Sequence, residues 1–86
     1  MEECKAEEFR EWLIENERSE NTINNYMESV KQFFALYPEV TKKNMIDFKQ
    51  QKLEKYSPKT AANRCIGMNQ YCEFVGKPEC KVKSIK

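Results

Sequence analysis

The sequence predicts an all-α protein, a small four-helix bundle built from two helix hairpins. Only two glycines and three prolines occur in 86 residues, so few residues interrupt a helix. Apolar residues recur at three- and four-residue spacing, which is the period of an amphipathic helix. A serine or threonine precedes several of these periodic segments, in the position of a helix cap. At this length the chain is expected to form one compact domain.

The first helix is expected from about Lys5 to Glu15. One side of it carries glutamates, and the other side is apolar, with Phe9, Trp12 and Leu13. Ser19 is the N-cap of a second helix, which Pro38 ends. This is the strongest helix in the sequence, because its apolar residues keep a helical period throughout: Ile23, Tyr26, Met27, Val30, Phe33, Phe34 and Tyr37.

Thr41 is placed to cap a third helix, roughly Lys42 to Lys55. It is expected to bury Met45, Ile46 or Phe48, and Leu53. Its exposed face is rich in lysine, and these side chains divide between phosphate contact and simple solvation: Lys42, Lys43, Lys49, Lys52 and Lys55.

Ser57 is an N-cap followed by Pro58 at the first helical position, where the missing N–H of proline does no harm. A fourth helix begins there, and Gly76 ends it near the C′ position. Residues 1–78 are therefore expected to form the helical domain. The segment 79–86 is short and basic, has no closing element and is interpreted as the start of a linker to a further domain.

A sequence pattern occurs twice, offset by 38 residues: Ser19, Thr22 and Asn25 match Ser57, Thr60 and Asn63. Two polar stripes continue it, and both are expected to face outward. They are Thr22, Asn25, Ser29 and Gln32 in the second helix, and Thr60, Asn63, Gly67 and Gln70 in the fourth. Gly67 costs about 1 kcal/mol of helix stability relative to alanine. Close approach of DNA or of another helix would explain a glycine at this position. The alternative is that the glycine is neutral and merely tolerated.

The charges are unevenly distributed along the chain. Residues 1–20 carry eight glutamates and three basic residues, whereas residues 21–86 carry twelve basic and six acidic residues. Residues 41–64 alone carry seven basic and two acidic residues. Such asymmetry indicates a polyanionic partner, although lysines also keep ordinary helix faces soluble. Two capped helices on a chain that is basic after residue 20 favour double-stranded DNA.

The four cysteines form no CxxC pair, and the chain has no histidine, so we expect no zinc site and no cofactor. Cys65 and Cys72 lie about 10 Å apart along one helix face, too far for a disulfide. They are interpreted as small core residues in a reducing compartment. No apolar run approaches the roughly 20 residues that span a bilayer, and the acidic amino terminus does not resemble a signal peptide. We expect a soluble cytoplasmic protein.

The order and spacing of these motifs resemble the core-binding, or SAM-like, amino-terminal domain of phage-type tyrosine recombinases, also called integrases. The resemblance covers about residues 6–78. Its marks are Ser19, Thr22, Ile23, Tyr26, Phe33 and Phe34, then Thr41, and finally Ser57, Pro58, Lys59, Thr60, Asn63 and Arg64.

In that family the domain is a four-helix bundle that joins a catalytic domain of the same chain and clamps duplex DNA, with two helices in or beside the major groove. The resemblance implies a DNA-binding module for site-specific integration and recombination of a mobile element, with other recombinase protomers as further partners. It places these residues near DNA: Thr22, Asn25, Lys59, Thr60, Asn63 and Arg64.

The physical chemistry of these residues supports DNA contact and also offers plainer roles. A helix amino terminus presents N–H groups and positive dipole to phosphate, and amide or guanidinium groups can read base edges. Ser19 and Ser57 also serve simply as caps, and Thr22 and Thr60 can satisfy backbone groups in the first turn.

Two other classes of function remain as alternatives. One is a helical protein-interaction module without direct DNA contact, using Trp12 and its acidic neighbours. The other is a redox or thiol enzyme that uses Cys65 and Cys72.

The chemistry of the resembled family is strand exchange. It needs a tyrosine nucleophile with arginines and usually a lysine and a histidine, and that set is not identifiable here. We expect no enzymatic activity from this fragment, and core or rim roles for Tyr26, Tyr37, Tyr56 and Tyr71.

Overall fold

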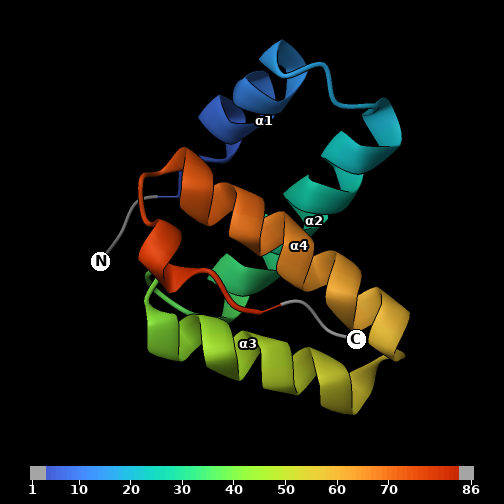
Figure 1. Ribbon diagram of the computed structural model, residues 1–86, viewed down its shortest axis with the longest axis vertical. Helices are drawn as coiled ribbons and strands as arrows, with labels where there is room; N and C mark the ends of the chain where they lie inside the picture. Colours follow the sequence, from blue (N-terminus) through green and yellow to red (C-terminus); the bar gives the residue numbers. More distant parts are fainter. Residues whose placement is uncertain (1–3, 84–86) are drawn as a thin grey trace.

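The computed structural model describes residues 4–83, which form a bundle of four helices and one short 3-10 turn. They are α1 (Ala6–Glu15), α2 (Glu20–Leu36), α3 (Lys42–Lys55), α4 (Pro58–Phe74) and η1 (Pro78–Cys80). α1 packs on α2 and α3 packs on α4, and the two hairpins meet where α2 and α4 cross (Figure 1). No strand occurs within the described residues. The all-α four-helix bundle that the sequence predicts is confirmed.

Three helices begin at the hydroxyl caps that the sequence predicts. The Ser19 hydroxyl accepts a hydrogen bond from the backbone N–H of Thr22 at 3.2 Å. Thr41 does the same for Asn44 at 3.1 Å, and Ser57 does so for Thr60 at 3.4 Å. Each bond satisfies one of the N–H groups that the first turn of a helix leaves without an internal partner.

The helix ends also follow from particular residues. Tyr37 is extended at the end of α2, as expected for a residue that precedes proline. Gly76 has a φ of +79° and follows the last residues of α4. The backbone N–H of Lys77 then bonds the carbonyl oxygen of Cys72 at 2.8 Å, and that of Gly76 bonds Glu73 at 3.2 Å. These two bonds form a Schellman motif, which confirms the predicted stop at Gly76.

Aromatic rings join all four helices in the core. Phe9 of α1 packs edge-on against Tyr71 of α4, with ring centroids 5.2 Å apart. Phe33 of α2 packs against Phe48 of α3 at 5.4 Å. Tyr71 is fully buried, and its hydroxyl accepts a hydrogen bond from the Lys5 backbone N–H at 3.0 Å. These contacts fix α1 and α3 on either side of the pair formed by α2 and α4.

The buried face of α3 differs from the predicted face. Met45 and Phe48 are fully buried as expected, but Ile46 is 44% exposed and Leu53 is 40% exposed. Lys52 is buried instead. The buried residues are spaced by three and four positions, which keeps them on one side of the helix, and Leu53 lies about 100° further round. Burial of Leu53 was therefore a wrong prediction.

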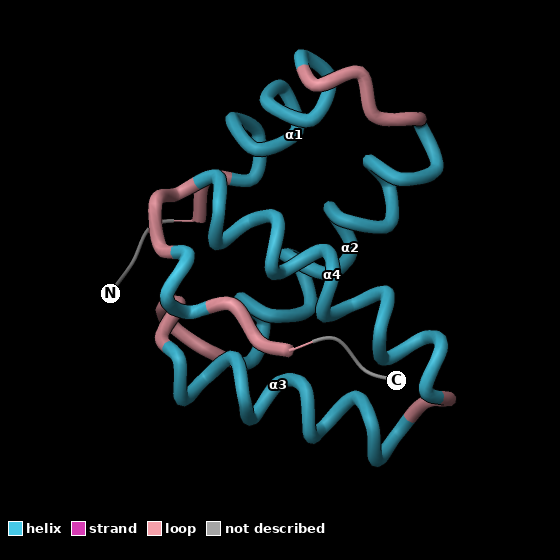
Figure 2. Tube along the Cα trace, in the orientation of Figure 1, coloured by secondary structure: helices cyan, strands magenta, loops and turns pink. Residues whose placement is uncertain are grey.

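The chain after α4 packs back onto the bundle, and we call residues 77–83 the C-terminal strap. It runs across the surface between α3 and α4 (Figure 2). Cys80 and Val82 are buried, whereas Lys83 is exposed. The sequence analysis expected no closing element here, and that expectation is wrong for the described residues. Residues 84–86 of the predicted linker lie outside them.

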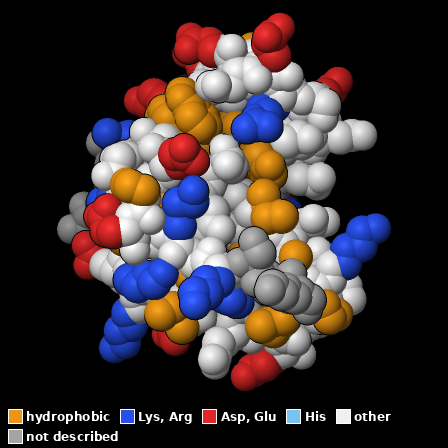
Figure 3. Space-filling model, viewed as in Figure 1, with side chains coloured by type: hydrophobic (Ala, Val, Ile, Leu, Met, Phe, Trp, Pro, Cys, Tyr) orange, Lys and Arg blue, Asp and Glu red, His pale blue; other side chains and the backbone are white. Residues whose placement is uncertain are grey.

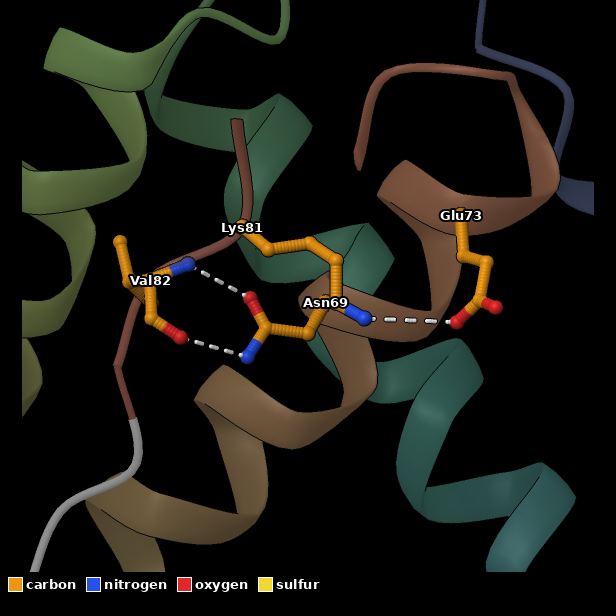
Figure 4. A network of polar contacts seen from close by, with 4 residues as sticks. All are labelled: Asn69, Glu73, Lys81 and Val82. Carbon is orange, nitrogen blue, oxygen red and sulfur yellow. Dashed lines mark hydrogen bonds and ion pairs between the residues drawn. The ribbon is translucent and has the colours of Figure 1, made fainter. Parts of the chain in front are cut away.

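The strap is held by side chains that bond its backbone. The Asn69 side chain donates to the carbonyl oxygen of Val82 and accepts from its N–H, both at 2.9 Å (Figure 4). The Lys81 ammonium lies 3.4 Å from the Glu73 carboxylate in the same network. Asn69 thus pairs with the backbone as a neighbouring strand would, which fixes this extended segment on α4.

Candidate nucleic-acid interface

The two repeated helices touch at the middle of their polar stripes. A Cβ added at Gly67 would lie 2.5 Å from the Ser29 Oγ, 2.7 Å from the Ser29 Cβ and 3.1 Å from the Tyr26 Cα. Ser29 and Gly67 are both buried. The prediction that both stripes face outward along their whole length is therefore wrong, because their middle positions form the crossing of α2 and α4. Of the explanations for Gly67, close approach of another helix holds.

The crossing also uses Arg64, one of the predicted DNA-binding residues. Its Nη1 donates to the carbonyl oxygen of Asn25 at 3.0 Å, and the Ser29 hydroxyl donates to the same oxygen at 3.1 Å. Arg64 is half-buried. A guanidinium has five N–H donors in a planar fork, so this bond fixes the group and leaves other donors for a second acceptor. Arg64 therefore has a structural role whatever else it binds.

Thr22 and Thr60 belong to the helix caps. The Ser19 hydroxyl donates to the Thr22 Oγ1 at 2.9 Å, and the Ser57 hydroxyl donates to the Thr60 Oγ1 at 3.2 Å. Both threonines are half-buried. Each accepts the hydrogen bond, so its own hydroxyl proton stays available to an outside acceptor. The capping role that the sequence left open is confirmed for both serines.

Lys59, Asn25 and Asn63 are the predicted site residues whose side chains are exposed. Both repeated helices begin on the same side of the molecule, at the right of Figure 1, and diverge from their crossing toward those starts. Asn63 lies in the first two turns of α4 with Lys59, while Asn25 occupies the equivalent turn of α2. The fold brings Asn25 and Arg64 into contact. The first turns of α2 and α4 themselves lie apart (Figure 1).

The first turns of the two helices carry opposite charges. Glu20 is the acidic residue in the first turn of α2, and the first turn of α4 contains Lys59 and no acidic residue. A helix amino terminus is positive, so a carboxylate there is favourable and an ammonium is unfavourable. The start of α4 therefore combines a positive helix end with a positive side chain, and an external anion relieves both.

Lys52 adds further positive charge close to the start of α4. It is 5% exposed, and its Nζ lies 5.2 Å from the ring centroids of Phe48 and Tyr56. Burial lowers the pKa of Lys52 from its usual value, and the charges of Lys55 and Arg64 lower it further, although Glu28 acts in the opposite direction. Sequence reasoning missed this burial, because lysine seldom lies inside a protein.

Two other lysines of α3 bind the C-terminal strap. The Lys42 ammonium donates to the carbonyl oxygen of Lys81, and the Lys49 ammonium donates to that of Lys83 at 3.0 Å. The sequence analysis divided these lysines between phosphate contact and solvation. Lys42 and Lys49 instead have a third role. Of the set, only Lys43 and Lys55 are exposed and make no such bond among residues 4–83.

Charge is unevenly distributed on the face that Figure 3 shows. Acidic side chains gather over the end formed by α1, whereas several basic side chains, with some acidic ones, lie over the half formed by α3, α4 and the strap. Such basic clusters favour the approach of a polyanion. On this face, the asymmetry along the sequence is also an asymmetry in space.

Trp12 contributes mainly to the packing of its own bundle. Its ring lies 5.5 Å from the Phe74 ring and 6.0 Å from the Phe9 ring, and the side chain is only half-exposed. In the protein-interaction alternative, Trp12 contacts a partner protein. Part of its ring stays exposed and could make such a contact. Its packing against α4 is also enough to explain a tryptophan here without any partner.

The cysteines and tyrosines of the described residues differ in burial. Cys65 and Cys72 are buried core residues as predicted, and burial raises the pKa of the Cys65 thiol, with Lys49 acting in the opposite direction. A raised pKa makes a thiol less nucleophilic at neutral pH. Tyr71 is buried and Tyr56 is exposed at the rim. Residues 4–83 contain no cluster of three metal-ligating side chains.

Among the described residues, no helix has the length and apolar character needed to cross a membrane. Comparisons with known protein families, with curated proteins and with solved structures found no match to this chain.

Proposed function

We propose that this domain is the core-binding domain of a tyrosine recombinase and that it binds duplex DNA at a recombination site. In this role it grips the site through the amino-terminal parts of α2 and α4, while a catalytic domain of the same chain cleaves and rejoins the strands. The module itself carries out no reaction. This role places the protein in the cytoplasm with the DNA.

The observation that carries the proposal is the charge at the start of α4. Lys59 lies in the first turn of a helix that has no acidic residue there, and residues 57–59 at this helix end are exposed. A protein without an anionic partner gains stability from an acidic residue at such a position. Phosphate groups of DNA supply the missing negative charge. They can also accept a hydrogen bond from the Lys59 N–H, since Pro58 has no N–H and the Thr60 N–H already bonds Ser57.

The six residues proposed to lie near DNA take different parts. Lys59 is expected to contact phosphate and to dominate affinity, since it is exposed. Asn63 is exposed one turn further along and has the amide geometry to read a base edge. Arg64 and Asn25 support the interface from the crossing, and the remaining residues donate hydroxyl groups: Thr22 and Thr60.

The proposal is tested by reversing charge at the start of α4 with a matched control. Lys59→Glu is compared with Lys31→Glu, because both lysines are exposed and both changes alter the net charge equally. Lys31 lies on a different face of α2, beside a cleft lined by Cys4, Ala6 and Phe34. We expect Lys59→Glu to weaken binding of a fluorescent duplex much more than Lys31→Glu.

The salt dependence of the same binding curves is a second measurement. Affinity should fall with salt by about 0.9 log unit per tenfold increase for each phosphate contact. Equal losses in the two variants, or a wild-type affinity that does not change with salt, would contradict a phosphate-binding start of α4.

A further inference from the structure

A cluster of basic side chains lies in the seam where α2, α3 and α4 meet. Lys52 of α3 is 5% exposed, and its ammonium faces the rings of Phe48 and Tyr56 at 5.2 Å. Within residues 4–83 it makes no hydrogen bond and no ion pair. The rings attract a cation, but they do not accept the three hydrogen bonds that an ammonium can donate. The Lys52 ammonium is not among the fully buried polar atoms that lack a partner in the described residues, so an acceptor from outside the protein can reach it.

The charges around Lys52 are unbalanced. Lys55 and Arg64 are close enough to disfavour its charged form, and Glu28 is the one carboxylate that favours it. The Glu28 carboxylate already accepts a hydrogen bond from the Gln32 side-chain amide at 3.0 Å. Three cations therefore lie near one carboxylate. An external anion at this place would favour the charged form of Lys52.

Arg64 gives the cluster a fixed geometry. Its Nη1 is bound to the carbonyl oxygen of Asn25 at 3.0 Å, which ties the guanidinium to α2. The other N–H groups of a guanidinium form a planar fork that matches the oxygens of a phosphate. The cluster lies beside the turn that leads into α4, because Tyr56 immediately precedes the Ser57 cap.

We propose that Lys52, Lys55 and Arg64 form a binding site for one backbone phosphate of duplex DNA, in the seam between the two helix hairpins. This site deepens the proposed function and rests on it. A phosphate has enough oxygens to accept from the ammonium and the guanidinium at once, and its charge offsets the three cations. The site takes one phosphate of the DNA strand and anchors α3 as well as α4 on it.

The test removes the charge of Lys52 and keeps its packing. Lys52→Met is compared with Lys43→Met, an exposed lysine about 14 Å away along the same helix. Because methionine fills the space of the lysine stem, we expect both variants to fold like the wild type, which circular dichroism checks. For a fluorescent duplex we expect Lys52→Met to bind roughly tenfold more weakly. Its salt slope should be smaller by about 0.9.

The control variant should keep the affinity and the salt slope of the wild type. If Lys52→Met also keeps both while the wild type binds DNA, then the seam holds no phosphate and the inference fails, although the proposed function stands. A loss of affinity with an unchanged salt slope also overturns it, because that pattern indicates lost packing and not a lost phosphate contact.

A direct measurement follows the pKa of Lys52 by NMR of its ε-methylene group, in the free protein and with two ligands. A phosphate in the seam stabilises the ammonium, so the duplex should raise the pKa of Lys52. A duplex that binds without changing the pKa of Lys52 overturns the site. Inorganic phosphate is the second ligand, and it distinguishes a DNA phosphate from a free one.

The two proposals can fail separately. If the wild type does not bind the duplex and inorganic phosphate still raises the pKa of Lys52, then the proposed function fails and the seam is a site for free phosphate. If neither ligand changes this pKa, the seam is a structural feature only and the inference is overturned.

Discussion

α2 and α4 are two helices of 17 residues that open with the same capping pattern and then serve different purposes. In both, a serine caps the third N–H and bonds the hydroxyl of a threonine. After this shared start, α2 carries Glu20 in its first turn and α4 carries Lys59. The repeated pattern therefore specifies where each helix begins. The residues between its serine and its threonine decide which ligand the start of the helix can bind.

The two helices are alike at the point where they cross. Each buries a large aromatic side chain elsewhere, Phe33 in α2 and Tyr71 in α4. At the crossing, Ser29 of α2 meets Gly67 of α4 with no room for a Cβ. Small residues on both helices let the two backbones approach closely. Ser29 and Gly67 have the same 38-residue offset as the caps, so the repeat places a small residue at the same position of each helix.

The largest predicted effect comes from filling the crossing. Gly67→Ala places a Cβ within 2.7 Å of the Ser29 Cβ, which the helices can relieve only by moving apart. We expect a loss of about 2 kcal/mol in the free energy of unfolding, although alanine favours a helix. Urea unfolding followed by circular dichroism measures it.

A compensating substitution at Ser29 is the matched control for this prediction. Ser29→Gly combined with Gly67→Ala restores the space and balances the helix propensities, so stability should return to within about 1 kcal/mol of the wild type. If Gly67→Ala alone is stabilising, or if the second substitution does not restore stability, the close crossing is not what limits this position.

The caps are predicted to be similar but not equal. Ser19→Ala should cost about 1 kcal/mol, because the Thr22 N–H loses its acceptor. Ser57→Ala should cost less, about 0.5 kcal/mol, since its bond to Thr60 is longer at 3.4 Å and Pro58 still fixes the first helical φ. Thermal unfolding of the two variants compares them. A larger loss for Ser57→Ala than for Ser19→Ala would show that Pro58 does not support the start of α4.

Exchanging the first-turn charges sharpens the comparison further. Lys59→Glu should stabilise α4 by about 0.5 kcal/mol and weaken DNA binding, because a carboxylate suits the helix end and repels phosphate. Glu20→Lys should have the opposite effects at α2, with a loss of similar size and stronger DNA binding. Denaturation and duplex titration measure both quantities on each variant. Changes of the same sign in stability and affinity would contradict this electrostatic account.

The smallest effect is a dependence on pH that involves Lys52. Its pKa is lowered in the folded protein, so in the alkaline range the unfolded chain binds more protons and stability gains a contribution that rises with pH. Lys52→Met lacks this contribution. Its stability relative to the wild type should therefore decline as pH rises toward the ordinary lysine pKa of about 10.4. Urea unfolding at several pH values measures the difference, and a constant difference would show that folding does not lower the pKa of Lys52.

Local features were predicted from the sequence because they depend on residues within a turn of one another. The caps at Ser19, Thr41 and Ser57 and the stop at Gly76 need only short-range hydrogen bonds and backbone preferences. The fold class followed from the periodic apolar residues, whose spacing indicates helices before any contact is known.

The wrong predictions concern contacts between distant segments. The outward placement of Ser29 and Gly67 failed because polar and small residues suit both a surface and a close helix crossing, and only the packing partner distinguishes them. For α3, Leu53 was preferred to Lys52 on hydrophobicity, whereas the position of the helix against Phe33 set which side was buried. The strap was missed because Asn69 holds it through backbone atoms, which a pattern of side chains does not reveal.

The most direct test of the account is an NMR titration of the labelled protein with a short duplex at low and then moderate salt. We predict salt-sensitive amide shifts that are largest at Lys59, Thr60 and Asn63 in α4, and smaller at Thr22 and Asn25 in α2. This order follows from the opposite charges of the two first turns. Shifts confined to α1, or no shifts at the start of α4 in a folded protein, would contradict the claim that this helix end faces DNA.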